Sequence, residues 1–393
     1  MEIAKTGNVK LNGYKWSVPS QSSNRQYDVI LRLGKSVCNC PDFVERGIKC
    51  KHIFAVEITL TKTIDCQGNT TVTQTKRITY PQNWKAYNTA QINEQELFMK
   101  LLVDLCKDIE EPLYTFGRSR LPLKDMVFSS ALKVYSMVSL RRFMGNTKTA
   151  VENGYISRQS SFTAVGKYMQ NEKLTPIINN LITLSALPLR GVETKFAPDS
   201  TGFRTTKFND YCREKHHTGK EHEWIKAHLI TGTKTNIITA VQVDIENGGD
   251  SPQFIPLIEQ TYNSGFTLNE VTADKAYNSA DNHRRVAELG GTAYIPFKSN
   301  STGSLVGNNA RVWRKMFNYF TYNKEEFLTH YHNRSNVEST INMIKAKFTD
   351  MVRSKDNVAR VNEVLLKVLC HNICVLIQEM YELGIEPNFY IGV

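Results

Sequence analysis

Four side chains capable of chemistry recur at helical intervals in the last quarter of the sequence. They are Tyr331, Arg334, Glu338 and Lys345, separated by steps of three, four and seven residues. At 3.6 residues per turn, these steps return to nearly the same side of a helix. A single helix over 331–345 would therefore present a phenol, a guanidinium, a carboxylate and an ammonium along one face.

A second stripe predicts which side of this helix is buried. Val337, Ile341, Ile344 and Phe348 recur at the same spacing and would pack against the rest of the protein. The alternative interpretation is a surface helix in which an arginine and a carboxylate form an ordinary i,i+4 pair, worth a few tenths of a kcal/mol. The spacing alone leaves both interpretations open.

Two further acids fall in strand-like segments upstream. Asp199 lies within APDSTGF, and Asp274 ends the strand expected within EVTADKAY. Sites in open α/β sheets form where strands finish, so both acids could meet Glu338. Three converging carboxylates repel one another and persist near neutral pH mainly when divalent cations lie between them. The competing acids, in loops or just after strands, rank lower: Asp210, Asp244, Glu246 and Asp250.

Oxygen ligands of this kind favour Mg²⁺ or Mn²⁺. Two such ions about 3.5–4 Å apart can activate an attacking oxygen and stabilise a leaving oxygen at a phosphodiester. The elements that must position the acids follow an α/β order between residues 191 and 350. Three strands are followed by helix, strand, helix, strand and the helix described first, which predicts a mixed five-stranded sheet with flanking helices.

A second chemical cluster lies near the N-terminus. Cys38, Cys40, Cys50 and His52 form two closely spaced pairs separated by a short loop. Three thiolates and an imidazole match tetrahedral Zn²⁺, and four protein ligands make such a site structural. Two short strands, over 16–18 and 27–33, precede the cluster and a helix follows it. Residues 1–60 are therefore predicted to form a small zinc-binding ββα module, against the alternative of a chance cluster.

The remaining segments connect these two parts. A polar linker is expected over 61–92, and a helical region over 93–190, its first helix opening at Asn93. That region is either a DNA-binding domain or a plain helical bundle, and its candidate phosphate contacts are Arg118, Arg120, Lys124, Arg141 and Arg142. A C-terminal helix and tail fill 351–393. In that helix Cys370, His371 and Cys374 are interpreted as core packing.

Charge narrows the class of partner. The chain has 393 residues, with 49 Lys and Arg against 38 Asp and Glu, and a net charge of +11. This surplus favours a polyanion, nucleic acid before membrane. The sequence shows neither a leader nor a long apolar run, so we expect no membrane partner and a cytoplasmic location.

These motifs together carry a family resemblance. The order DST, ADKAY and Tyr-x2-Arg-x3-Glu-x6-Lys resembles the DDE transposases of prokaryotic insertion sequences, which have an RNase H-like core. The N-terminal Cys-x-Cys and Cys-x-His pairs resemble the SWIM zinc finger, a module associated with nucleic-acid or protein binding. The resemblance implies an RNase H-like α/β catalytic domain preceded by a helical region and a zinc module.

The resemblance also implies roles for particular residues. Asp199, Asp274 and Glu338 would bind the catalytic Mg²⁺ or Mn²⁺, and Tyr331, Arg334 and Lys345 would hold DNA at the scissile phosphate. The reaction would be hydrolysis at the ends of a mobile element, followed by attack of the freed 3′-hydroxyl on target DNA. A homodimer on double-stranded DNA, associated with the nucleoid, is expected by the same resemblance.

One residue departs from this expectation. Pro198, which cannot donate a ladder hydrogen bond, directly precedes Asp199 in a strand that should be internal. The strand is therefore expected to end or bulge there, unless the copy is impaired. Two alternatives remain at this stage: a DNA-binding protein that keeps the fold without catalysis, and a structure-specific nuclease of the same fold.

Overall fold

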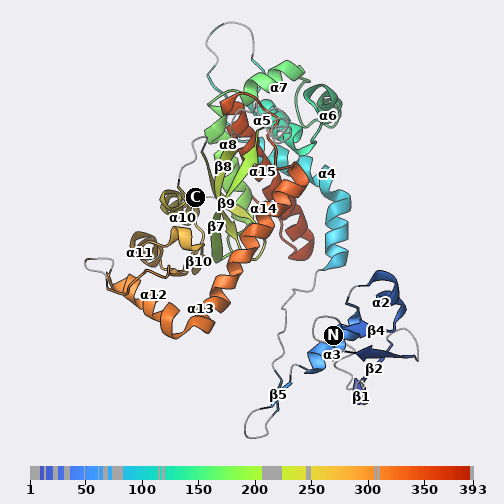
Figure 1. Ribbon diagram of the computed structural model, residues 1–393. Coiled ribbons are helices and arrows are strands. Elements are labelled where there is room, and N and C mark those ends of the chain that lie inside the picture. The colour runs from blue at the N-terminus through green and yellow to red at the C-terminus, as the bar shows by residue number, and fades with distance from the viewer. Residues whose placement is uncertain are drawn as a thin grey trace, which may run out of the picture. The chain divides into compact units, whose positions relative to one another are not determined.

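The computed structural model describes most of the chain, which separates into two compact units, Met1–Pro81 and Gln82–Val393 (Figure 1). The described residues are 9–12, 15–20, 25–30, 36–47, 49–60, 62–64, 70–72, 83–113, 116, 120–205, 224–244, 249–304, 307 and 310–389. The two units are described separately below.

The smaller unit is built on an antiparallel sheet with strand order β1-β2-β3-β4. Its elements are β1 (Lys10–Asn12), β2 (Lys15–Pro19), β3 (Gln26–Ile30), β4 (Val37–Cys38), α2 (Pro41–Arg46) and α3 (Lys51–Leu60). The sequence predicted only β2 and β3, because two- and three-residue strands leave no alternation to detect. Val18, Val29, Ile53 and Val56 are fully buried in a core that also contains Ala55, Cys38, Cys40 and Cys50.

The predicted linker contains regular structure. A short antiparallel pair, β5 (Lys62–Ile64) and β6 (Thr70–Val72), lies within it. Its last part is the beginning of α4 (Trp84–Cys106), so the expected helix start at Asn93 is wrong. Asn83 caps this helix by accepting a hydrogen bond from the Ala86 amide at 3.2 Å. Asn93 lies inside the helix, where its side-chain amide donates to the Thr89 carbonyl instead.

A mixed five-stranded sheet forms the centre of the larger unit, as predicted. Its strands are β7 (Lys195–Arg204), β8 (Trp224–Gly232), β9 (Ile238–Asp244), β10 (Glu270–Thr272) and β11 (Thr292–Tyr294), in the order β11-β10-β7-β8-β9. The first three form an antiparallel meander, and β10 and β11 run parallel to β7. Since β10 has only three residues, it borders only the first part of β7.

Helices cover both faces of this sheet (Figure 1). α10 (Ser251–Asn263) lies on one face, where Thr261 bonds to Thr239 of β9, and α11 (Ala280–Glu288) packs beside β11. The other face is covered by α8 (Leu174–Ala186), α14 (Ser335–Phe348) and α15 (Asn357–Glu382). On length and hydropathy α15 would suffice to cross a membrane, but most of it is buried inside the protein as a core helix.

The N-terminal helices share one hydrophobic core with the sheet. They are α4, α5 (Leu123–Tyr135), α6 (Leu140–Glu152) and α7 (Phe162–Met169). Cys370 and His371 of α15 are buried in this core, as predicted, and the His371 ring bonds to the Asn236 carbonyl at 3.0 Å. Arg118, one of the predicted phosphate contacts, lies outside the described residues.

The single helix predicted over 331–345 is in fact two helices. α13 (Lys324–Tyr331) ends at the tyrosine, a 3₁₀ turn covers His332–Arg334, and α14 begins at Ser335. His, Asn and Ser have lower helix propensity than the residues on either side, which favours the tighter turn here. The predicted buried stripe is nevertheless present, because Val337, Ile344 and Phe348 are almost completely buried.

Candidate active site and candidate zinc site

Asp199 lies in the middle of β7, opposite Leu229 of β8. Side chains alternate between the two faces of a strand, so Asp199 shares a face with Phe203, whereas Ser200 points to the other side. Phe203 contacts Lys345 of α14, whose ammonium lies 5.7 Å from the ring centroid. Asp199 therefore faces α14.

α14 is held along β7 by polar contacts from one of its sides. Asn336 donates to the Thr233 carbonyl at 2.9 Å, and the Thr340 hydroxyl donates to the Asn236 side chain at 3.0 Å. These contacts fix the helix to the turn between β8 and β9. Beyond the helix, Arg204 at the end of β7 pairs in parallel with Met351. The strand and the helix therefore run in the same direction, with Arg334 near Asp199 at one end.

Arg334 connects two of the predicted carboxylates. Its Nη2 donates to Oδ2 of Asp199 at 3.2 Å, and its Nη1 donates to Oε1 of Glu338 at 2.6 Å. The side chains of Asp199 and Arg334 are 18% and 20% exposed, whereas that of Glu338 is 58% exposed. The i,i+4 pair of the alternative interpretation is thus present, but its arginine also reaches a mostly buried acid 135 residues away.

The electrostatics of Asp199 reflect a site that concentrates negative charge. Burial raises the pKa of Asp199, while the Ser200 amide, 2.9 Å away, and the Arg334 guanidinium act against this rise. The charges of Glu338 and Asp274 raise the pKa of Asp199 further. The three carboxylates therefore lie close enough to repel one another, and the charge of Arg334 offsets part of this repulsion.

Asp274 follows β10 by two residues and caps the short turn Lys275–Tyr277. Its Oδ1 accepts from the Lys275 amide at 2.7 Å. Burial raises the pKa of Tyr331, the charge of Arg334 lowers it, and Asp274, Glu338 and Asp199 raise it again. Tyr331 therefore lies in the field of the three carboxylates. Their oxygens do not all lie within 4.8 Å of one another, a condition that only the cysteine and histidine cluster meets among the described residues.

Lys345 lies two turns further along α14. Burial lowers the pKa of its ammonium, the charge of Asp350 raises it and that of Arg204 lowers it again. Its neighbours are thus Phe203 and the Arg204–Asp350 ion pair, at the far end of β7 from Asp199. Of the residues predicted to hold phosphate, Tyr331 and Arg334 lie beside the carboxylates and Lys345 lies apart from them.

Pro198 neither ends nor bulges the strand. It pairs with Ile230 in an uninterrupted register from Phe196 to Arg204. The Thr194 carbonyl accepts from the amides of Asn269 and Glu270, on the β10 side, whereas the Lys195 carbonyl accepts from the Thr233 amide, on the β8 side. Because backbone polar groups alternate along a strand, the even-numbered residues of β7 direct theirs away from β8. The missing N–H of Pro198 therefore faces the side where β10 has already ended, and no ladder bond is lost.

The competing acids do not face Asp199. Asp244 and Asp250 flank the buried His228, each 3.6 Å from one of its ring nitrogens, and Lys226 pairs with Asp250 at 2.7 Å. His228 lies opposite Ser200 and therefore on the other face of the sheet from Asp199. Asp210 and Glu246 lie outside the described residues.

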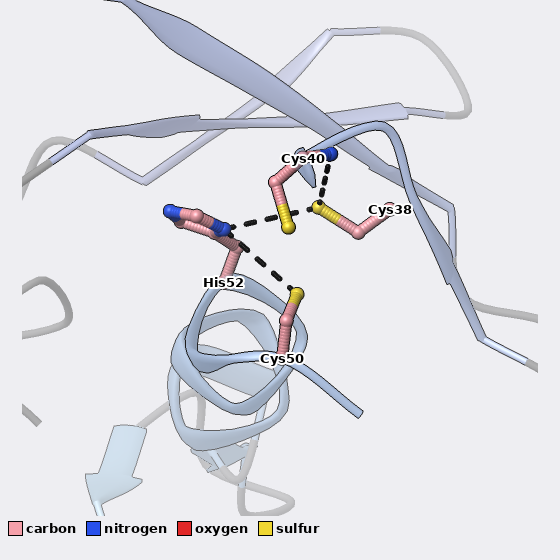
Figure 2. Close-up of side chains that lie close together, drawn as sticks. All are labelled: Cys38, Cys40, Cys50 and His52. Atoms are coloured by element: carbon pink, nitrogen blue, oxygen red, sulfur yellow. Dashed lines mark hydrogen bonds between the residues drawn. The ribbon is translucent and has the colours of Figure 1, made fainter. Parts of the chain in front are cut away.

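The predicted zinc ligands come together in the smaller unit (Figure 2). Cys40 precedes α2, Cys50 precedes α3, and His52 is in the first turn of α3, so two helix starts and the end of β4 supply the four side chains. All four are buried, and their ligand atoms lie within 4.8 Å of one another. The Nδ1 atom of His52 is 3.9 Å from the Cys38 sulfur and 3.8 Å from the Cys50 sulfur.

This arrangement fits a metal ion. A nitrogen and a sulfur bound to one tetrahedral zinc lie about 3.6 Å apart, given bond lengths of about 2.1 and 2.3 Å. Burial lowers the pKa of His52, which keeps the imidazole neutral and able to bind metal. Without a cation, burial raises the pKa of Cys38 far above its usual range, so zinc would bind by displacing thiol protons.

Comparisons with known proteins identify a domain in each of the two units. Residues 190–373 match the family model described as the transposase DDE domain, and residues 27–60 match the SWIM zinc finger. The larger unit carries a transposase DDE domain. The resemblance of residues 190–373 to DDE transposases and of the N-terminal unit to the SWIM zinc finger is thereby confirmed.

One solved structure is also similar to this chain. It is the cryo-EM structure of the piggyBac transposase synaptic complex with hairpin DNA, which has 11% sequence identity and a TM-score of 0.37. The similarity covers 75% of this chain and 74% of that chain.

Sequence reasoning did not predict the hydrogen bonds that hold the site in place. Asn336, Thr340 and His371 all bond to the turn between β8 and β9. Asn236 in that turn has a positive φ of 66°, which a helical contact on each side stabilises. Asn336 and Thr340 lie among other polar residues of α14, and nothing in their spacing distinguishes them from solvated positions.

Proposed function

We propose that this transposase cuts and joins DNA with Asp199, Asp274 and Glu338 as its catalytic acids. The observation that carries the proposal is the contact of one guanidinium with two of these acids from opposite ends of the domain sequence. A fold without chemistry has no need to bury Asp199 beside two other carboxylates. The non-catalytic alternative does not account for that cost in desolvation.

The donor set suits Mg²⁺ or Mn²⁺, because all three side chains offer only carboxylate oxygens. Divalent cations bound there would activate the attacking oxygen and stabilise the leaving oxygen of a phosphodiester. Asp199 is fixed by the Ser200 amide, whereas Glu338 on the exposed first turn of α14 has room to adjust. The strand therefore supplies a rigid acid and the helix supplies an adaptable one.

Tyr331 and Arg334 would position the phosphate next to these acids. Arg334 already lies between two carboxylates and can present its remaining donors to a phosphate oxygen. Tyr331, at the end of α13, would donate a hydrogen bond from its phenol hydroxyl to the same DNA backbone. Lys345 lies two turns away and would contact a neighbouring phosphate of the same strand, not the scissile one.

The proposed substrates are the double-stranded ends of a mobile element and a target duplex. Hydrolysis would free a 3′-hydroxyl, and attack by that hydroxyl would join the element to the target. We propose a homodimer on DNA, since two ends must be processed together, and a cytoplasmic, nucleoid-associated location in a prokaryotic cell. The zinc finger is proposed to hold structural Zn²⁺.

The deciding experiment compares wild-type protein with Glu338→Gln on a labelled duplex carrying the element's end, with Mg²⁺ or Mn²⁺. The isosteric amide removes the charge and should reduce cleavage by at least about 10³-fold while duplex binding stays within about threefold. Asp244→Asn, which changes an acid on the opposite sheet face, is the matched control and should cleave normally. Full cleavage by Glu338→Gln would reject the catalytic assignment.

A further inference from the structure

Helix α12 (Ala310–Tyr322) is fixed to the catalytic sheet through an aromatic cluster. Phe297, just after β11, contacts Trp313, Phe317 and Phe320 with ring centroids 4.8, 5.3 and 5.7 Å away. The Trp313 indole N–H also donates to the Thr302 carbonyl at 2.8 Å. One side of α12 is therefore packed and held in a defined orientation.

The opposite side of α12 is cationic and exposed. Arg311, Arg314 and Lys315 lie at i, i+3 and i+4, and Tyr322, eleven residues after the first, extends the same side with 80% exposure. No ion pair involves these three cations among the residues that the structure describes. Other exposed cations do have acidic partners: Arg284, for example, bonds to Glu288 at 2.5 Å.

The local sequence explains why these charges are unpaired. Residues 289–324 contain five cations and no Asp or Glu, although the whole chain has 38 acids. The five are Lys298, Arg311, Arg314, Lys315 and Lys324. An uncompensated cationic helix face repels itself and is retained at a cost, which a polyanionic partner would offset.

α12 is also tied to the candidate active site. Phe327 of α13 is fully buried and contacts Phe320 of α12 at 5.1 Å, and His330 stacks on Tyr294 of β11 at 4.3 Å. α13 then ends at Tyr331. Its eight residues span about 12 Å, or three to four base pairs of duplex.

We propose that the exposed side of α12, formed by Arg311, Arg314, Lys315 and Tyr322, is a docking surface for the phosphate backbone of duplex DNA. This contact lies a few base pairs from the scissile phosphodiester at the three carboxylates. It does not depend on the base sequence of the DNA. The inference rests on the proposed function, since it takes the same DNA as its partner. A backbone contact is favoured because the three cations offer donors to phosphate oxygens, and at least half of protein–DNA hydrogen bonds go to phosphate and sugar.

The test measures how salt weakens binding of the full-length protein to a fluorescent duplex of arbitrary sequence. Each phosphate contact contributes about 0.9 to the slope of log K against log salt concentration. The double variant Arg311→Gln/Lys315→Gln should reduce that slope by about 1.8 and weaken binding at least about tenfold at low salt. The matched control Arg284→Gln/Arg285→Gln removes two cations from neighbouring α11, both engaged with acids, and should leave the slope unchanged.

The outcomes separate this inference from the proposed function. If both double variants lose the same slope, total charge and not α12 is responsible, and the docking surface is rejected. The docking surface is also rejected if the α12 variant binds duplex DNA like wild type, which is the result expected if α12 binds an acidic protein instead. Glu338-dependent cleavage by wild type would stand in either case, whereas absence of any duplex binding by wild type would reject both proposals. Equal melting temperatures establish that both variants are folded.

Discussion

Arg334 donates a hydrogen bond to Asp199 at 3.2 Å across 135 residues of sequence. The contact joins the middle of β7 to the turn that precedes α14, and the same guanidinium bonds to Glu338 at 2.6 Å. A positive charge thus lies between two acids that would otherwise repel each other. It occupies the place beside the carboxylates that a divalent cation would compete for.

Removing this charge should strengthen metal binding while weakening the reaction. In Arg334→Gln the two carboxylates lose their internal counterion, so Mn²⁺ affinity without DNA should rise by roughly tenfold, about 1.4 kcal/mol. Electron paramagnetic resonance of free Mn²⁺ during a titration measures this directly. Cleavage should fall, because the phosphate loses a guanidinium donor.

The control for this prediction is Lys345→Gln, which also removes one cation from the same face. Lys345 lies over Phe203 near Asp350, away from the carboxylates, and its loss should change Mn²⁺ affinity by less than about twofold. Equal affinity gains in both variants would mean that overall charge, not the position of Arg334, governs metal binding.

Pro198 should prove dispensable for the strand. Its nitrogen faces the side of β7 that β10 leaves open, so Pro198→Ala should change the free energy of unfolding by less than about 1 kcal/mol and leave cleavage near wild type. Ala197→Pro is the matched contrast, since position 197 bonds to β8, and it should cost about 3 kcal/mol or more. Denaturant unfolding measures both. Similar losses in the two variants would show that the register argument is wrong.

The sequence predicted the sheet and the chemical types of its site well, but not how the acids are arranged. The strands of the meander either alternate apolar and polar residues or are long apolar runs, so the sequence pattern predicts β7, β8 and β9. The signature ending at Lys345 fixed residue types along the chain. It could not show that a 3₁₀ turn interrupts the helix, because its steps fit a continuous helix equally well. Nor could it show that Arg334 reaches Asp199, since that contact depends on how α14 docks on the β8–β9 turn through Asn336.

A buried glutamate should make stability depend on pH. Burial raises the pKa of Glu379 to about 7, and repulsion by Glu382 and Glu193 adds to the rise. The folded protein therefore holds a proton that the unfolded chain releases near its ordinary pKa of about 4.3, so Glu379 makes stability fall as pH rises from about 4.5 to 7. Above that window the full cost of the charge is present.

Glu379→Gln removes this cost. The variant should unfold like wild type near pH 5 and be more stable at pH 8, by about 1–3 kcal/mol. Thermal or urea unfolding at the two pH values measures the difference. Glu386→Gln, at an exposed position beyond α15, is the control and should show no pH-dependent gain. A gain of equal size at both pH values would point to packing and not to ionisation.

Zinc removal should unfold the smaller unit alone. Its core is small, with five buried apolar side chains besides Cys38, Cys40 and Cys50, so we expect a metal cross-link to be needed to hold β4, α2 and α3 together. A zinc chelator should abolish one thermal transition and leave that of Gln82–Val393 unchanged, because the two units have separate cores.

Cys50→Ser should reproduce the loss of this transition without chelator. Lys51→Gln, between two ligands but not one itself, should keep both transitions and bind Co²⁺ with thiolate charge-transfer absorption. A smaller unit that melts at the same temperature with and without chelator would show that its fold does not depend on the metal.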